Sequence, residues 1–82
     1  MNTPQPQEHY HFFVDGQRFE SNKRHLLGSE IKARVNAPPE YQLFLEEQGD
    51  TPDKPIGDDE TVDLQGSIKH FYAVPPATFG RS

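Results

Sequence analysis

Residues 9–21 read HYHFFVDGQRFES, and this stretch predicts a β-hairpin at the start of the fold. Its first half, residues 9–15, is rich in the aromatic and β-branched residues that are typical of strands. Asp15-Gly16 is the strongest short hairpin signal in the chain, because glycine readily takes the positive φ that a primed turn needs. We therefore expect residues 17–21 to return antiparallel to the first strand.

Alternation along the first strand assigns its core-facing side chains. Tyr10, Phe12 and Val14 are two residues apart, so they share one face of a pleated strand. We expect this aromatic and aliphatic face to be buried.

A short helix is predicted after the hairpin, beginning near Gly28-Ser29, where the serine hydroxyl is placed to cap it. Ile31 and Val35 lie four residues apart on one helical face, and Leu27 extends this apolar stripe toward the entering chain. Asn36 can end the helix in the left-handed conformation, before two prolines that cannot continue it. At about two turns, the helix needs a sheet for support.

Two further strands follow the helix. Residues 41–45 alternate so that Tyr41, Leu43 and Leu45 face one side and Phe44 faces the other. Residues 67–74 form the last strand, but both of its alternating sets contain large side chains, so the pattern leaves open which set is buried. Residues 46–66 between them are rich in Gly and Pro and predict an irregular crossover. We expect Val62 and Leu64 to anchor this crossover, which can also hold a short turn of helix.

The order of hairpin, helix, strand, crossover and strand predicts an α+β fold of the β-grasp type. It is a mixed sheet of four to five strands with one helix packed across one face, and the first and last strands pair in parallel at the centre. Residues 1–8 are polar and contain two prolines, which predicts a disordered N-terminal tail. Residues 9–75 then form the domain, and residues 76–82 form a flexible C-terminal tail.

Composition narrows the classes of function. The chain has 82 residues and no cysteine, so we expect one small domain without disulfides, zinc-thiolate sites or a thiol nucleophile. Thirteen acidic against eight basic residues give a net charge of −5, and the basic residues are scattered, which argues against nucleic-acid binding. The sequence has no long apolar run and no signal-peptide pattern, so we expect a cytoplasmic protein without a membrane partner.

Four segments in register resemble the bacterial multiubiquitin family of ubiquitin-like domains. They are FVDGQ at 13–17, LGSEI at 27–31, YQLFL at 41–45 and IGDDETVDL at 56–64. Members of that family are β-grasp proteins found in bacterial operons, several of them linked to defence against phage. The resemblance implies three partners: a ubiquitin-activating-like enzyme, a ubiquitin-conjugating-like enzyme and a JAB-type deubiquitinating peptidase. The target protein is not implied.

The same resemblance implies a protein modifier that is conjugated through Gly80. A JAB-type peptidase would cleave between Gly80 and Arg81, and an isopeptide bond would then join the glycine to a target. A terminal glycine suits the narrow channel of an adenylating enzyme, because it has no side chain to clash. Extended at about 3.1 to 3.3 Å each, residues 75–80 project this carboxylate about 20 Å from the sheet.

Partner contacts are expected at two aromatic residues, Phe79 beside the cleavage site and Phe44 on the open face of the sheet. Cover by the N-terminal tail or by the last strand is an alternative for Phe44. The candidate acceptor lysines for chain formation are Lys23, Lys32, Lys54 and Lys69. Each lysine, taken singly, is better explained as solvated surface charge.

Two other functions compete with the modifier. One is a non-conjugated β-grasp binding or adaptor module that uses its sheet face or an edge strand. The other is a sulfur carrier with a C-terminal thiocarboxylate. Enzyme activity, a cofactor and a metal are not expected. His9 and His11 share a strand face, but two ligands do not make a metal site.

Overall fold

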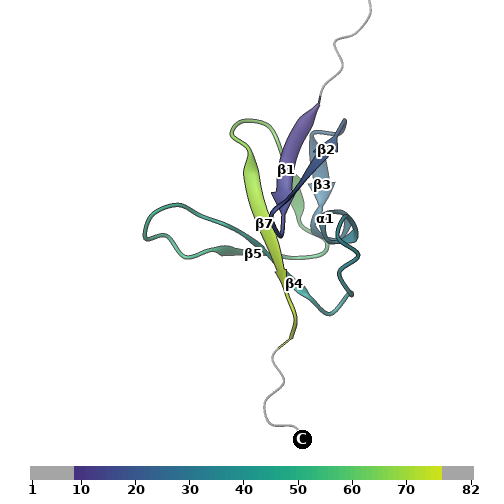
Figure 1. The fold of residues 1–82 in the computed structure, drawn as a ribbon, viewed down its shortest axis with the longest axis vertical. Helices are drawn as coiled ribbons and strands as arrows, with labels where there is room; N and C mark the ends of the chain where they lie inside the picture. Colours follow the sequence, from purple (N-terminus) through teal and green to yellow (C-terminus); the bar gives the residue numbers. More distant parts are fainter. Residues whose placement is uncertain (1–8, 77–82) are drawn as a thin grey trace, which may run out of the picture.

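The computed structural model describes residues 9–76, and the predicted hairpin is its first element (Figure 1). Strand β1 (Tyr10–Val14) pairs antiparallel with β2 (Gln17–Ser21). Between them, Asp15 and Gly16 have φ angles of 52° and 80°, the two positive values that a type I′ turn requires. The hairpin and its turn are confirmed.

Five strands form one mixed sheet, in the order β2-β1-β7-β4-β5. Strand β4 spans Gln42–Leu45, β5 spans Lys54–Ile56 and β7 spans Lys69–Val74. β7 lies at the centre, parallel to β1 and antiparallel to β4. The parallel pairing of the first and last strands is confirmed, and within residues 9–76 the sheet and one short helix have the predicted β-grasp α+β architecture.

A second, two-stranded sheet was not predicted. It consists of β3 (His25–Leu27) and β6 (Thr61–Asp63), which pair antiparallel. The expectation of a short helical turn in residues 46–66 is wrong: in the described chain this crossover contains β5 and β6 and no helix. Val62 and Leu64 are buried, as predicted for its anchors.

Helix α1 (Gly28–Ala33) buries Ile31 completely in the core. Val35, in the turn that follows, packs against the same core. Leu27, however, does not extend this stripe: it is 38% exposed, and Leu26 is buried in its place. Both leucines belong to strand β3, where successive side chains point to opposite sides, so helical spacing does not apply to them.

The helix N-terminus is capped by neighbours and not by the Ser29 hydroxyl. The backbone N–H of Ser29 donates to the carbonyl of Asp58, and that of Gly28 donates to the carbonyl of Glu60. The carboxylate of Glu30 accepts from the backbone N–H of Leu27 at 2.8 Å. The predicted ending is confirmed, because Asn36 after the helix has a φ of 56°.

The core lies between the five-stranded sheet and the helix. Its buried apolar side chains, among residues 9–76, are Phe12, Val14, Leu26, Ile31, Leu43, Ile56, Val62, Leu64 and Phe71. Burying one such side chain contributes about 1.5 to 3 kcal/mol relative to exposing it. Because Phe71 is buried, its neighbours His70 and Tyr72 face away from the helix, which resolves the orientation of β7. Within residues 9–76, no helix has the length and apolar character needed to cross a membrane.

Candidate functional site

Two aromatic stacks lie on the open face of the sheet, opposite the helix. The Phe13 ring of β1 stacks on the imidazole of His70, with centroids 4.7 Å apart and planes 7° apart. The Phe44 ring of β4 stacks on Tyr72, with centroids 5.4 Å apart and planes 19° apart. The structure therefore puts Phe44 on the predicted face, where the last strand covers it in part. Its role in partner binding stays a prediction.

Sequence reasoning missed three of these four rings. Phe13 lies between Phe12 and Val14, so the alternation that assigned those two residues to the core already placed it on the other face. For His70 and Tyr72 no local signal existed, because the face of β7 depends on its pairing with β1.

The loop between β4 and β5 is tied to this face through Asp53. Its carboxylate accepts hydrogen bonds from the Tyr72 hydroxyl and, at 2.9 Å, from the backbone N–H of Glu47. The first bond, aided by the second, lowers the pKa of Asp53, and the same bond to Asp53 raises the pKa of Tyr72. These contacts fix the tyrosine ring beside Phe44.

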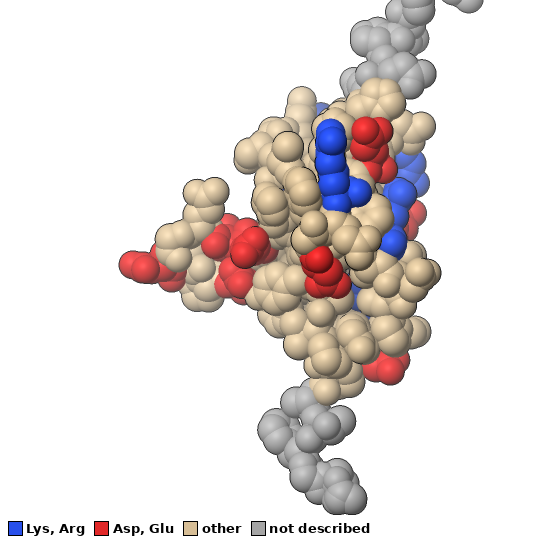
Figure 2. Space-filling model, viewed as in Figure 1, with Lys and Arg blue, Asp and Glu red and all other residues tan. Residues whose placement is uncertain are grey.

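This loop carries only acidic charge. Its charged side chains are Glu46, Glu47, Asp50 and Asp53. In Figure 2 the arm on the left shows acidic side chains and no basic side chain in this view. A partner that contacts the arm meets a negative surface, so basic partners are favoured there.

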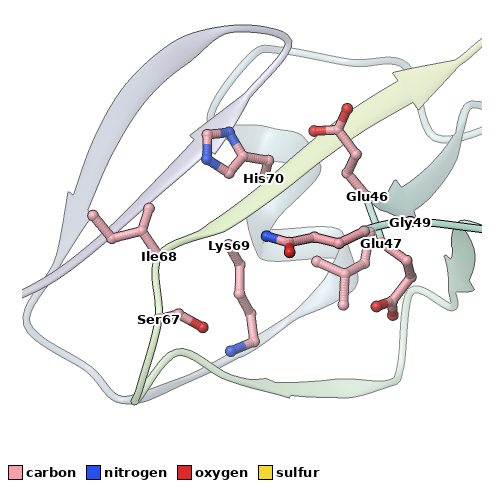
Figure 3. Close-up of a pocket in the computed structure, with 9 residues that line it drawn as sticks. Glu46, Glu47, Gly49, Ser67, Ile68, Lys69 and His70 are labelled. Carbon is pink, nitrogen blue, oxygen red and sulfur yellow. The ribbon is translucent and has the colours of Figure 1, made fainter. Parts of the chain in front are cut away.

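An open groove of about 840 Å³ lies between this loop and the start of β7. Figure 3 shows Glu46 and Glu47 on the loop side and Ile68, Lys69 and His70 on the β7 side. Ile68 is 51% exposed and offers an apolar side chain at the edge of the groove. The groove joins the open aromatic face through His70, so the two form one continuous surface.

The four candidate acceptor lysines differ in accessibility. The Lys23 and Lys54 side chains are 61% and 57% exposed and pair loosely with Glu30 and Glu60 at 3.6 and 3.3 Å. Lys69 is half-buried and lines the groove. These three amines can be reached from solvent.

Lys32 is different, and the expectation of a solvated surface charge is wrong for it. The residue is 4% exposed. Its Nζ donates to the carbonyls of Pro39 and Tyr41 at 2.9 and 2.7 Å and lies 2.8 Å from a carboxylate oxygen of Asp58. All three N–H groups of the ammonium are therefore engaged, and the amine is not free to act as a nucleophile.

Strand β7 runs past the end of β1, and Asp15 braces the part that extends beyond. The backbone N–H of Asp15 donates to the Phe71 carbonyl at 3.0 Å, and its carboxylate accepts from the Ala73 N–H at 3.2 Å. The turn residue thus continues the contacts of β1 up to the last residues of the strand. Beyond Pro76, the predicted residues Phe79, Gly80 and Arg81 lie outside the described residues.

His9 and His11 lie close to Glu20, and His11 also lies close to Arg18. His9 and His11 approach the Glu20 carboxylate at 3.6 and 3.7 Å, but the Arg18 guanidinium lies 3.0 Å from the same nitrogen of His11. A positive charge in that position would repel a metal ion. Over residues 9–76 no group of three or more potential ligands is arranged to hold one.

Comparison with known families gives a match. The family model described as Multiubiquitin matches residues 10–75, which spans every strand and the helix described above. Searches of curated proteins and of solved structures give no match.

Proposed function

The chain belongs to the multiubiquitin family, and we propose that it is a ubiquitin-like protein modifier, cleaved after Gly80 and then conjugated to target proteins. A JAB-type peptidase removes Arg81-Ser82, an adenylating enzyme activates the new carboxylate, and a conjugating enzyme transfers it. The family match carries this proposal, because it covers the whole described domain. The setting that we propose, also on family resemblance, is the bacterial cytoplasm and defence against phage.

The position of β7 supports this role. The strand that leads to Gly80 is the central one, held on both sides by β1 and β4, and Asp15 braces it almost to its end. The hydrogen bonds to both neighbouring strands therefore resist displacement of β7 when force acts on the residues that follow it. The exposed residues Pro75 and Pro76 come next, and their restricted φ stiffens the start of the tail.

The chain itself contributes a substrate and no catalytic group. The activating enzyme binds ATP and Mg²⁺ and supplies the cysteine, since this chain has no thiol. A lysine amine of the target then attacks the thioester carbonyl of Gly80; the C–N bond forms, the C–S bond breaks, and the thiol leaves with the proton that the amine loses. On this chain, Lys23, Lys54 and Lys69 are the accessible acceptors.

The processing step is tested with the purified chain and the JAB-type peptidase, read by intact mass spectrometry. We expect loss of Arg81 and Ser82 only, and no cleavage of a Gly80→Val variant. An unchanged mass for the wild-type chain, with a peptidase that cleaves its own cognate precursor, contradicts processing at this site. The activating enzyme and a sulfur donor can also be added. A gain in mass equal to the replacement of one oxygen by sulfur at Gly80 would then identify a sulfur carrier instead.

The aromatic face favours a second candidate, a non-conjugated binding module. A module of this kind keeps its partner when residues 80–82 are deleted and loses it when Phe44 is replaced by alanine. A modifier loses conjugation with the deletion. Pull-down and conjugation assays on the two variants separate the candidates.

A further inference from the structure

The two edges of the five-stranded sheet differ in their protection against pairing with another chain. A free edge exposes unpaired backbone N–H and C=O groups, and proteins blunt such edges with short strands, lysine or proline. The β5 edge has all three protections: it is three residues long and contains Lys54 and Pro55. The β2 edge has five residues, QRFES, with no lysine or proline and no bulge in its register with β1. Its only protection of this kind is the charge of Arg18 and Glu20, so β2 is the less protected edge.

The outward backbone groups of β2 belong to Arg18 and Glu20. In a two-residue hairpin the residues beside the turn exchange hydrogen bonds, and bonded and non-bonded pairs alternate from there. Because Val14 and Gln17 flank this turn, Phe19 also bonds inward to β1 and its two neighbours point outward. The hydrogen bond from the Asp15 N–H to the Phe71 carbonyl of β7 agrees with this pattern. It shows that the backbone groups of odd-numbered residues in the β1 segment point toward β7 and away from β2.

We propose that β2 pairs antiparallel with β2 of a second copy of this chain, with the two-fold axis at Phe19. Arg18 of each copy then lies opposite Glu20 of the other, and both backbone hydrogen bonds of each pair can form. The two side chains project from the same open face, since Phe19 between them packs inward on Phe12. Two symmetric ion pairs result.

The charges select this register over its neighbours. Moving the two-fold axis to Arg18 or to Glu20 would also let outward backbone groups pair. It would, however, put Arg18 opposite Arg18 or Glu20 opposite Glu20. Like charges directly opposite each other are destabilising, whereas opposite charges are favourable. The pattern of β2 is thus self-complementary in one register only.

Phe19 adds an apolar contact at the axis. It is half-buried on the edge strand and stacks on Phe12 at a centroid distance of 5.9 Å, so it is not fully covered. In the proposed dimer the two Phe19 residues form a non-hydrogen-bonded pair, the closer type of cross-strand pair. Each ring then covers the exposed part of the other.

Existing contacts of the two charged residues do not prevent this pairing. Arg18 contacts His11, and Glu20 lies 3.6 to 3.7 Å from His9 and His11. Arg18 and Glu20 are exposed, and exposed ion pairs of this kind are weak. By strand order the β2 edge is also remote from β4 and β5, so the dimer leaves the groove beside β4 uncovered.

Sedimentation equilibrium of the full chain tests the proposal. One strand pair is a small interface, so we expect a transient dimer that is populated at about 0.1 to 1 mM protein. Arg18→Glu alone and Glu20→Arg alone should each weaken association about ten-fold, because each leaves like charges opposite. An equimolar mixture of the two variants should restore association, since each acid of one variant then faces a base of the other.

Two controls accompany this experiment. Circular dichroism checks that both variants fold. Glu40→Arg changes the net charge as Glu20→Arg does, at an exposed position outside β2, and should leave association unchanged. The proposal fails if the wild-type chain is monomeric up to 1 mM, if the mixture associates no better than either variant, or if Glu40→Arg weakens association equally.

Discussion

Gly28, the first residue of α1, has no space for a methyl group. A Cβ at this position would overlap the carbonyl oxygen of Gly57 and lie 3.0 Å from the carbonyl carbon. Both are backbone atoms in the loop after β5, so neither can rotate away. We therefore predict that Gly28→Ala destabilises the fold, although glycine-to-alanine changes in a helix usually stabilise.

The size of this destabilisation follows from the contacts between the helix end and the loop that the added methyl group would disturb. Relieving the overlap moves the loop off the helix end, which strains the packing by about 1 to 3 kcal/mol. It also weakens the hydrogen bonds from the Gly28 and Ser29 N–H groups to Glu60 and Asp58, 3.0 and 3.2 Å long, each worth about 0.5 to 1.5 kcal/mol. The higher helix propensity of alanine returns up to about 1 kcal/mol. The net loss is about 3 kcal/mol, a large fraction of the stability of a small domain.

Urea unfolding at equilibrium measures this loss, and Gly57→Ala is the matched control. A Cβ at Gly57 meets only the Cβ of Glu60, at 4.0 Å, which is an ordinary contact. This variant should change the free energy of unfolding by less than about 1 kcal/mol. If Gly28→Ala is as stable as the wild type, or if both variants lose the same amount, the steric argument is refuted.

Two further predictions concern charged groups. The carboxylate of Asp63 accepts hydrogen bonds from Arg24 at 2.8 and 2.9 Å and from the backbone N–H of Gln65 at 2.9 Å, which hold its pKa well below its ordinary value. A depressed pKa contributes stability that is present above the unfolded-state pKa of about 4 and is lost as the pH falls through the folded-state pKa. Asp63→Asn should therefore have a lower free energy of unfolding in urea than the wild type at pH 7, and this difference should be smaller at pH 3. An equal difference at both pH values would contradict this. Lys32→Met removes the buried ammonium and leaves the part-buried carbonyls of Pro39 and Tyr41 without their donor, and it should cost about 2 to 4 kcal/mol. The exposed Lys23→Met should change stability by no more than about 0.5 kcal/mol, and equal unfolding midpoints for the two variants would show that the Lys32 network is unimportant.

Sequence predicted the parts of this fold whose signals are local. The turn at Asp15-Gly16 is specified by two adjacent residues, and the register of the hairpin follows from it. The end of α1 at Asn36 is likewise encoded in the residues that adopt it. In each case the conformational preference of the segment agrees with its tertiary contacts.

The small sheet of β3 and β6 had no such signal. Each strand has three residues, too few to show alternation, and Leu26 and Leu27 fit an apolar helical stripe equally well. Their pairing, with Leu26 opposite Val62, joins segments far apart in the chain. The burial of Lys32 was missed for the same reason, because its partner Asp58 belongs to that distant crossover.

The face of β7 shows how a long-range contact completes the candidate site. Each of its alternating sets contains a large ring, Phe71 in one and Tyr72 in the other, so hydrophobicity along the strand is nearly equal on both sides. Parallel pairing decides between them: Val14, already assigned to the core, lies beside Phe71, and Phe13 lies beside His70. Side chains on neighbouring strands at one level of a sheet share a face, so Phe71 must be buried and Tyr72 must be open. The open aromatic face is therefore a consequence of the hairpin pattern of β1, transmitted through one strand pairing that the order of elements predicts.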